Sequence, residues 1–339
     1  MAETGVLTSD ALAVKVWRAK FLQEYRVEQW FRSNGMIGMS DESVIQEFED
    51  LNTQKGDRIT CGIIMALTGT GASGNATMET NEEEMGKYYQ NVTIDRIRNA
   101  VLLDGSMSEQ RIMINLRDAA KNGLKVWVAE REDSDLFTAQ CASPTKVYYG
   151  GAATSTATLT ATDYMTLDLL SKCKAYAMSA TPKLPPVRIG GKPYYVVVMH
   201  THDAYDLRIN DPKYAQWRRD SAPRQEAMMS SENLLLNRAF LEYDDMLLFE
   251  HPSLPIATTW GAGGNVAGAT ALFMGRQAGF IAFGGAVKGT GKVSWQEKTF
   301  DYGEKTGFCI GTTRGQVKAQ FNSKDYSCVN VKTARTNVS

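Results

Sequence analysis

The chain has 339 residues, of which 43% are hydrophobic and 22% are charged, a composition typical of globular proteins with a sizeable core. Its 37 basic and 38 acidic residues leave a net charge of -1, which argues against a domain dedicated to nucleic acid or anionic lipid. No run approaches the roughly 18 apolar residues of a membrane span, and no secretory leader is evident, so we expect a protein made in a cytoplasm.

The N-terminal segment carries an unusual number of aromatic residues. Between Ser9 and Asn34, Trp17, Phe21, Trp30 and Phe31 alternate with charged residues at spacings that predict one or two amphipathic helices. Such side chains need a surface to pack against, because left in water they would form an apolar patch of the kind that marks an interface. That surface is either the chain's own core or a neighbouring chain.

Two strands are predicted next, over residues 58–66 and 88–103. In the second strand the alternation of apolar residues slips near Asp95 and Arg96, as a bulge or bend would produce. The intervening residues, 67–87, are rich in Gly, Thr and Asn. A loop of this length in a compact domain usually has a function, and we interpret it as the tip of a long hairpin.

The hairpin loop contains a partial dinucleotide-binding motif. Gly69, Gly71 and Gly74 follow a strand with the spacing G-x-G-x-x-G. A phosphate-binding loop must open into a helix whose N-terminal N–H groups face the anion, but no helix is predicted here. The residues that follow would repel a diphosphate, since they include Glu79, Glu82, Glu83 and Glu84. We therefore interpret the glycines as residues that supply positive φ at an exposed tip.

A second glycine-rich loop, residues 289–293, resembles a phosphate-binding P-loop only superficially. Val293 stands where the motif requires Ser or Thr, and Ala286 stands where it requires the first glycine. A turn between strands explains the same residues.

A long helix is predicted over residues 107–131. Ser106 and Glu109 form an S-x-x-E capping box, and apolar residues follow at helical spacing with only Gly123 interrupting them. Such a helix would be about 37 Å long, roughly twice the average in globular domains, and could serve as a spine.

The second half of the chain mixes helices and strands. We expect a loop over 146–159, an amphipathic helix over 160–178 and a strand buried on both faces over 194–200. Two short helices should cover 201–220, the first with Thr201 as its N-cap. A buried strand at 246–251, an apolar region at 270–285 and several antiparallel strands in 293–331 complete the prediction.

The chain offers no convincing catalytic or metal-binding residues. His200, His202 and His251, with Asp203, could be imagined as a metal cluster, but a capped helix start explains the first two equally well. The adjacent Asp244 and Asp245 would point to opposite sides of a strand, which makes them a poor acid–base pair. A G-x-S-x-G motif is absent. The five cysteines show no C-x-x-C pair and predict neither a disulfide framework nor a zinc site; they are Cys61, Cys141, Cys173, Cys309 and Cys328.

Taken in order, seven short stretches resemble the Hong Kong 97-type major capsid proteins of tailed bacteriophages. The likeness is greatest to the subfamily found in short-tailed phages with a virion RNA polymerase. Each stretch is weakly specific by itself, but the ordered set spans nearly the whole chain. They are "GDRIT" from Gly56, "LTGTGASGNATMETNEEE" from Leu67, "MSEQR" from Met107, "YYVVVMH" from Tyr194, "FMGRQAGFIAFG" from Phe273, "FDYGEKTGF" from Phe300 and "GQVKAQFNSKDYS" from Gly315.

The resemblance implies an α+β capsid fold with five consecutive parts. These are an N-terminal arm over 1–56, an extended hairpin loop over 57–104, a peripheral domain with the spine helix over 105–159, an axial domain over 160–285, and peripheral strands with the C-terminal segment over 286–339.

The implied function is self-assembly, as hexamers and pentamers, into an icosahedral shell around double-stranded DNA, without catalysis or cofactors. Implied partners are the portal, scaffold or decoration proteins and, non-specifically, the packaged DNA; no membrane is involved. We expect the protein in the virion after assembly in the bacterial cytoplasm. The subunit contacts expected are Trp17, Phe21, Trp30, Phe31, Gly69, Gly71 and Gly74. The alternatives are a nucleotide- or metal-dependent cytoplasmic enzyme, which would use the glycine-rich loops or the histidines, and an encapsulin-like compartment shell.

Overall fold

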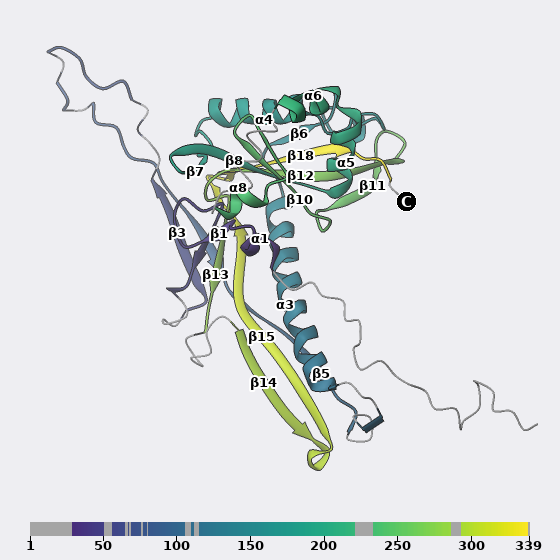
Figure 1. Ribbon diagram of the computed structural model, residues 1–339. Helices are drawn as coiled ribbons and strands as arrows, with labels where there is room; N and C mark the ends of the chain where they lie inside the picture. The colour runs from purple at the N-terminus through teal and green to yellow at the C-terminus, as the bar shows by residue number, and fades with distance from the viewer. Residues whose placement is uncertain are drawn as a thin grey trace, which may run out of the picture.

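The computed structural model describes residues 29–50, 56–64, 67, 69–75, 77–79, 81–105, 110–111, 115–220, 233–285 and 293–337. Figure 1 shows a broad body of sheet and helices, a long limb that descends from it, and a hairpin that leaves the molecule on the opposite side from the C-terminus. Within these residues no helix combines the length and the apolar character needed to cross a membrane.

The body is built on a sheet in which eight of the described strands take part. Its main path runs β6-β18-β12-β8-β10-β9, with β11 beside β12 and β7 beside β8. Within this sheet β8 and β10 are parallel, and Met246 lies opposite Tyr195. The bounds are β6 Val147–Tyr149, β7 Val187–Ile189, β8 Lys192–Met199, β9 Leu241–Tyr243, β10 Met246–Glu250, β11 Ile256–Trp260, β12 Val266–Met274 and β18 Cys328–Ala334.

Strand β8 is buried on both faces, as predicted, because its alternate residues enter two separate cores. Val196 and Val198 face a core that includes Phe31 and Phe137. Tyr195 and its alternate neighbours face a second core that the body's helices cover. Those helices are α4 Leu167–Ser179, α5 Thr201–Asn210 and α6 Pro212–Asp220, while α1 Trp30–Ser33 and α8 Leu234–Arg238 contribute to the first core.

The limb is organised around one long strand, β15, which covers Lys305–Lys318. One end of β15 pairs with β13, and the other end lies between β14 and β5. The described strands of this sheet follow the order β1-β2-β13-β15-β14, with β5 also on β15. Their bounds are β1 Ile37–Gly38, β2 Ile45–Phe48, β5 Asp95–Leu102, β13 Gly279–Phe283 and β14 Val293–Phe300, and a small hairpin of β16 Gln320–Phe321 and β17 Lys324–Asp325 follows β15.

Helix α3 runs along the limb and into the body (Figure 1). It covers Leu116–Cys141, a length of about 39 Å at 1.5 Å per residue. The predicted spine helix therefore exists, but its predicted end at residue 131 was wrong by ten residues. Its described start is capped by Asn115, whose side chain accepts from the N–H groups of Arg117 and Asp118. The predicted capping box, Ser106 and Glu109, lies outside the described residues.

The predicted slip in the second strand is confirmed. Strand β4, Lys87–Thr93, pairs with β3, Arg58–Ile64, whereas β5 begins at Asp95 and pairs with β15. Ile94 separates the two strands and donates its N–H to the carbonyl of Asp57. The alternation changes phase because the chain leaves the hairpin and enters the limb at this residue.

Two other expectations need correction. The segment 146–159 is not all loop, since it contains β6 and the short 3-10 helix Thr156–Thr158. The helix expected from residue 160 begins at Leu167, because the Thr166 side chain accepts from the N–H of Leu169 and acts as N-cap.

Candidate functional site

The glycine-rich motif lies in the extended hairpin and forms no phosphate site. Gly71 and Gly74 adopt φ of 65° and 67°, which confirms their predicted role in an exposed turn. The N–H of Gly69 donates to Oε2 of Glu83 at 2.7 Å, and a Cβ on Gly69 would meet only the end of this flexible, exposed side chain. The described residues between Gly69 and β4 contain no helix whose N-terminus could hold a phosphate.

The hairpin itself is a two-stranded sheet with large exposed apolar side chains. Its base is anchored, because Val92 packs in a small core with Phe280. Among the described strands, β3 and β4 pair only with each other. A two-stranded hairpin by itself is marginally stable in water. Among the described residues of the hairpin, the large apolar side chains that are exposed are Ile64, Leu67, Met78, Met85 and Tyr89.

The three histidines do not converge on a metal. The rings of His200 and His202 lie 4.8 Å apart, whereas the ring of His251 stacks on Phe137 and lies beside Trp30. Among the described residues, no three His, Cys, Asp or Glu side chains form a group that could hold a metal ion. The predicted N-cap Thr201 was wrong by one residue, because the side chain of His200 accepts from the N–H of His202 and caps α5.

Asp244 and Asp245 do not point to opposite sides, as a strand would require. They form the tight turn between β9 and β10, with φ of 47° and 55°, typical of a primed hairpin turn. Both carboxylates accept from Nζ of Lys174, at 2.7 Å and 2.8 Å. The pair thus joins this turn to helix α4.

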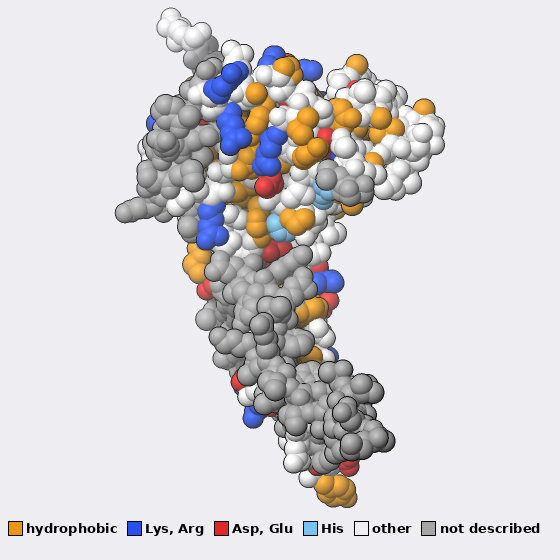
Figure 2. All heavy atoms as spheres, turned by 45° about the vertical axis from the view of Figure 1, so that its right-hand side comes forward, with side chains coloured by type: hydrophobic (Ala, Val, Ile, Leu, Met, Phe, Trp, Pro, Cys, Tyr) orange, Lys and Arg blue, Asp and Glu red, His pale blue; other side chains and the backbone are white. Residues whose placement is uncertain are grey.

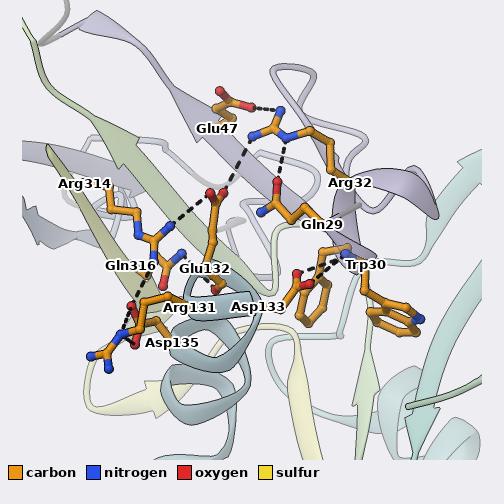
Figure 3. Close-up of polar contacts among 11 residues, drawn as sticks. Gln29, Trp30, Arg32, Glu47, Arg131, Glu132, Asp133, Asp135, Arg314 and Gln316 are labelled. Atoms are coloured by element: carbon orange, nitrogen blue, oxygen red, sulfur yellow. Dashed lines mark hydrogen bonds and ion pairs between the residues drawn. The ribbon is translucent and has the colours of Figure 1, made fainter. Parts of the chain in front are cut away.

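A charged network joins four elements where the limb meets the body, and Figure 3 shows it. We call it the junction network and define it as Arg32 of α1, Glu47 of β2, Glu132, Asp133 and Asp135 of α3, and Arg314 of β15. Arg314 donates to Oε2 of Glu132 and to Oδ2 of Asp135, both at 3.0 Å. Arg32 donates to Oε2 of Glu47 at 2.9 Å and lies 3.8 Å from Glu132. Guanidinium groups suit this role because they donate several hydrogen bonds in a fixed plane.

The centre of the junction network is removed from water. The Arg314 side chain is 1% exposed and that of Glu132 is 9% exposed. Gln316, two residues along β15, also faces the helix and donates to the backbone carbonyl of Glu132. Charged side chains at buried positions interrupt an amphipathic pattern, which explains why the sequence placed the end of α3 too early.

Asp133 fixes the N-terminal segment to the helix. Its carboxylate accepts from the N–H of Trp30 at 2.7 Å and from that of Phe31 at 3.4 Å, so it satisfies the first N–H groups of α1. Burial raises the pKa of Asp133 from 3.8 to about 6, although the two backbone N–H groups act in the opposite direction.

Trp30 and Phe31 pack against their own chain. Phe31 is fully buried, and its ring lies 4.7 Å from that of Phe137. Trp30 is half-buried, with ring contacts to Phe249 and His251. Of the two surfaces considered for this segment, these two residues use the chain's own core. A subunit contact for them stays a prediction, and Trp17 and Phe21 lie outside the described residues.

Replacing Asp133 with asparagine should make the free energy of unfolding less dependent on pH. Because its pKa is higher in the folded protein, Asp133 binds a proton there at pH values where the unfolded chain does not. Its contribution to the free energy of unfolding therefore falls by about 3 kcal/mol as pH rises from about 3 to about 7. Urea unfolding across this range should show a correspondingly smaller fall for Asp133→Asn. The exposed Asp118→Asn on the same helix is the control; an unchanged pH profile in Asp133→Asn would contradict the assignment.

The far end of the limb carries a feature that sequence reasoning missed. Gly307 of β15 has no side chain, and Phe300 and Leu102 lie across the space where its Cβ would be. In the turn beyond them, Asp301 and Tyr302 adopt φ of 52° and 49°, and the Tyr302 side chain is fully exposed. Hydrophobic side chains are visible at this end in Figure 2. In the sequence this feature corresponds to the turn-forming residues Asp301, Tyr302 and Gly303, which directly follow Phe300.

Comparison with known proteins decides the family. The family model described as phage capsid protein matches residues 5–145 and 140–337. The chain belongs to the phage capsid protein family. A curated relative, the major capsid protein of Pseudomonas phage KPP25, is 27% identical to this phage capsid protein over 94% of each chain.

Solved capsid structures agree with the assignment. The capsid of Ralstonia phage GP4 superimposes with a TM-score of 0.86 at 26% identity, covering 100% of both chains. The capsid of cyanophage Pam1 gives a TM-score of 0.81 at 22% identity, covering 99% of this chain and 100% of that one. The chain is thus a phage major capsid protein, and neither its geometry nor its relatives support the enzyme alternative.

Proposed function

We propose that this phage capsid protein is the repeating subunit of an icosahedral shell, built from hexamers and pentamers, around the double-stranded DNA of a tailed phage. The observation that carries the proposal is the match over the full length of both chains with the capsid of Ralstonia phage GP4. The shape is suited to such a shell, because a compact body with two long extensions offers each copy contacts beyond its immediate neighbour.

The finer assignments belong to the same proposal. We place the chain among the Hong Kong 97-type capsid proteins, in the subfamily of short-tailed phages with a virion RNA polymerase. The division into five parts stays a proposal, in which α3 and β15 would form the spine of the peripheral domain. Two of its expected limits would move: the hairpin would end at Ile94, since β5 pairs with β15 of the limb, and β18 would join the body, since it pairs with β12. The portal, a scaffold or decoration protein and the packaged DNA would be partners, with assembly in the bacterial cytoplasm.

The extended hairpin is the strongest candidate for a contact with the next copy. Its exposed apolar side chains, and the face of its two-stranded sheet that does not pack on the chain's own core, would gain from a second chain packed against them. Gly69, Gly71 and Gly74 would then shape its tip for that contact. The N-terminal arm, with Trp17 and Phe21, is proposed as a second contact.

Electron microscopy of the purified protein tests the proposed function. Negatively stained samples should contain closed shells, tubes or arrays of capsomers. A protein that stays monomeric at all concentrations and binds nucleotide or zinc would overturn the proposal.

Replacing Tyr302 with serine should impair assembly without impairing folding. The Tyr302 side chain is fully exposed and adds no packing to the described part of the chain, whereas aromatic residues often dominate the energy of an interface. Light scattering should show that the protein concentration needed for shell formation rises at least about tenfold, equivalent to about 1.4 kcal/mol per contact. Tyr302→Phe keeps the ring and should assemble nearly as the wild type does. Normal assembly of Tyr302→Ser would show that this end of the limb is not an assembly contact.

A further inference from the structure

The end of the C-terminal strand is held against helix α5 by side chains that lie outside the junction network. The backbone N–H of Thr336 donates to Oδ2 of Asp206 at 2.7 Å, and the hydroxyl of Thr333 donates to Oδ1 of Asp203 at 3.3 Å. The N–H of Arg335 donates to the carbonyl of Ala267 on β12. The last described residues are therefore fastened to α5 and β12 by specific polar contacts.

Two histidines complete this attachment, and both must accept hydrogen bonds at Nδ1. Nδ1 of His200 accepts from the backbone N–H of His202 at 3.1 Å, and Nδ1 of His202 lies within hydrogen-bond distance of Nη1 of Arg335. A backbone N–H and a guanidinium can only donate. Neither Nδ1 atom can therefore carry a proton while these two contacts exist.

The surroundings disfavour a further positive charge. Arg335 is 8% exposed and His200 is 5% exposed, so solvent screens the charges weakly. Burial lowers the pKa of His200 most, and the nearby His202 and Arg335 lower it further. A hydrogen bond with the backbone of Pro252 acts in the opposite direction.

The nearby acidic groups offset little of that charge. Asp206 is fully buried and already accepts from the N–H of Thr336 and from Asn210. Asp203 is fully buried as well, and burial raises its pKa well above the ordinary value, which weakens it as a partner for a cation. Farther along α5, Arg208 is paired with Glu250.

We propose that His200, His202 and Arg335 form an acid-released latch, which holds the end of the C-terminal strand on helix α5 at neutral pH. Protonation of either Nδ1 turns an acceptor into a donor that faces another donor, and it places a positive charge near Arg335. The contact then opens, and residues 335–337 leave the helix. Because the pKa of His200 is lowered, the latch is complete at neutral pH and opens only as pH falls below the ordinary range of histidine. It belongs to the single chain and does not depend on the proposed shell.

Amide hydrogen exchange of the full-length protein tests the latch. Exchange is measured by mass spectrometry at pH 7.5 and pH 5.0 and corrected for the intrinsic pH dependence of the chemistry. Peptides that contain residues 331–337 should exchange at least about tenfold faster at pH 5.0, equivalent to about 1.4 kcal/mol. Equal corrected exchange at the two pH values would overturn the proposal.

The double variant His200→Asn/His202→Asn isolates the two imidazoles. The asparagine carbonyl oxygen can accept where Nδ1 does, and asparagine is a good N-cap, but it cannot gain a proton. Exchange in the variant should therefore be the same at both pH values, and an acid response that persists would overturn the proposal.

The third histidine provides a matched control. Nδ1 of His251 also accepts from a backbone N–H, that of Ser253 at 3.2 Å, but His251 lies beside Trp30 and Phe137. His251→Asn should keep the full acid response of the C-terminal strand, and loss of that response would contradict the proposal.

If the double variant does not fold, Arg335→Gln serves instead. This substitution removes the fixed charge, but the glutamine side chain can still donate a hydrogen bond. The acid response of the variant should therefore shrink at least about threefold, and an undiminished response would overturn the latch.

Discussion

Replacing Arg314 with alanine is expected to lower the free energy of unfolding by about 3–5 kcal/mol, because it leaves the buried carboxylate of Glu132 with only the more distant cation of Arg32, 3.8 Å away. Arg314 is the most deeply buried charge of the junction network and donates to both Glu132 and Asp135. Chemical denaturation of the soluble subunit measures the change. We expect Arg314→Lys to recover only part of the loss, since a single Nζ would have to replace two separate guanidinium nitrogens that donate to Glu132 and Asp135.

A partly exposed ion pair in the same chain provides the control for Arg314. Arg208 contacts Glu250 at 2.8 Å, and both side chains are more than one third exposed. Arg208→Ala should change stability by about 1 kcal/mol or less. Similar losses for Arg208→Ala and Arg314→Ala would show that the junction network does not hold the limb and body together as described.

Replacing Phe31 with alanine should cost about 3–5 kcal/mol, as expected for a large aromatic side chain removed from a core. Phe31 is fully buried beside Phe137 and lies on the element that Asp133 caps. Shell formation should fail as well, but as a consequence of lost stability. Thermal unfolding measures the effect.

Phe300 serves as the matched control for Phe31, because its side chain is 43% exposed at the end of the limb. Phe300→Ala should lower stability much less than Phe31→Ala does. If Phe31→Ala unfolded like the wild type yet failed to assemble, Phe31 would be a subunit contact, as first expected from the sequence, and its place in the core would be wrong.

The sequence predicted elements whose pattern is local. Strand β8 was recognisable because a short apolar run must be buried on both faces, and its residues do enter two cores. The break at Ile94 was visible as a change of phase, and the conformations of Gly71 and Gly74 followed from their setting in a polar loop.

Features that depend on distant residues could not be predicted in this way. Arg314 and Glu132 are separated by 182 positions, and nothing near either residue indicates its partner. Glu132 and Asp133 look like exposed helix residues in sequence, so the pattern ended α3 too early. Tyr302 was overlooked because one aromatic residue in a turn is unremarkable until the structure shows its ring in solvent at the far end of the limb.

The most direct test of the proposed shell is a single-particle reconstruction of the assembled protein. The account predicts icosahedral particles in which Ile64 and Tyr89 of the hairpin, together with Tyr302 of the limb, are buried against neighbouring copies. Particles in which these three side chains remain exposed to solvent would contradict it.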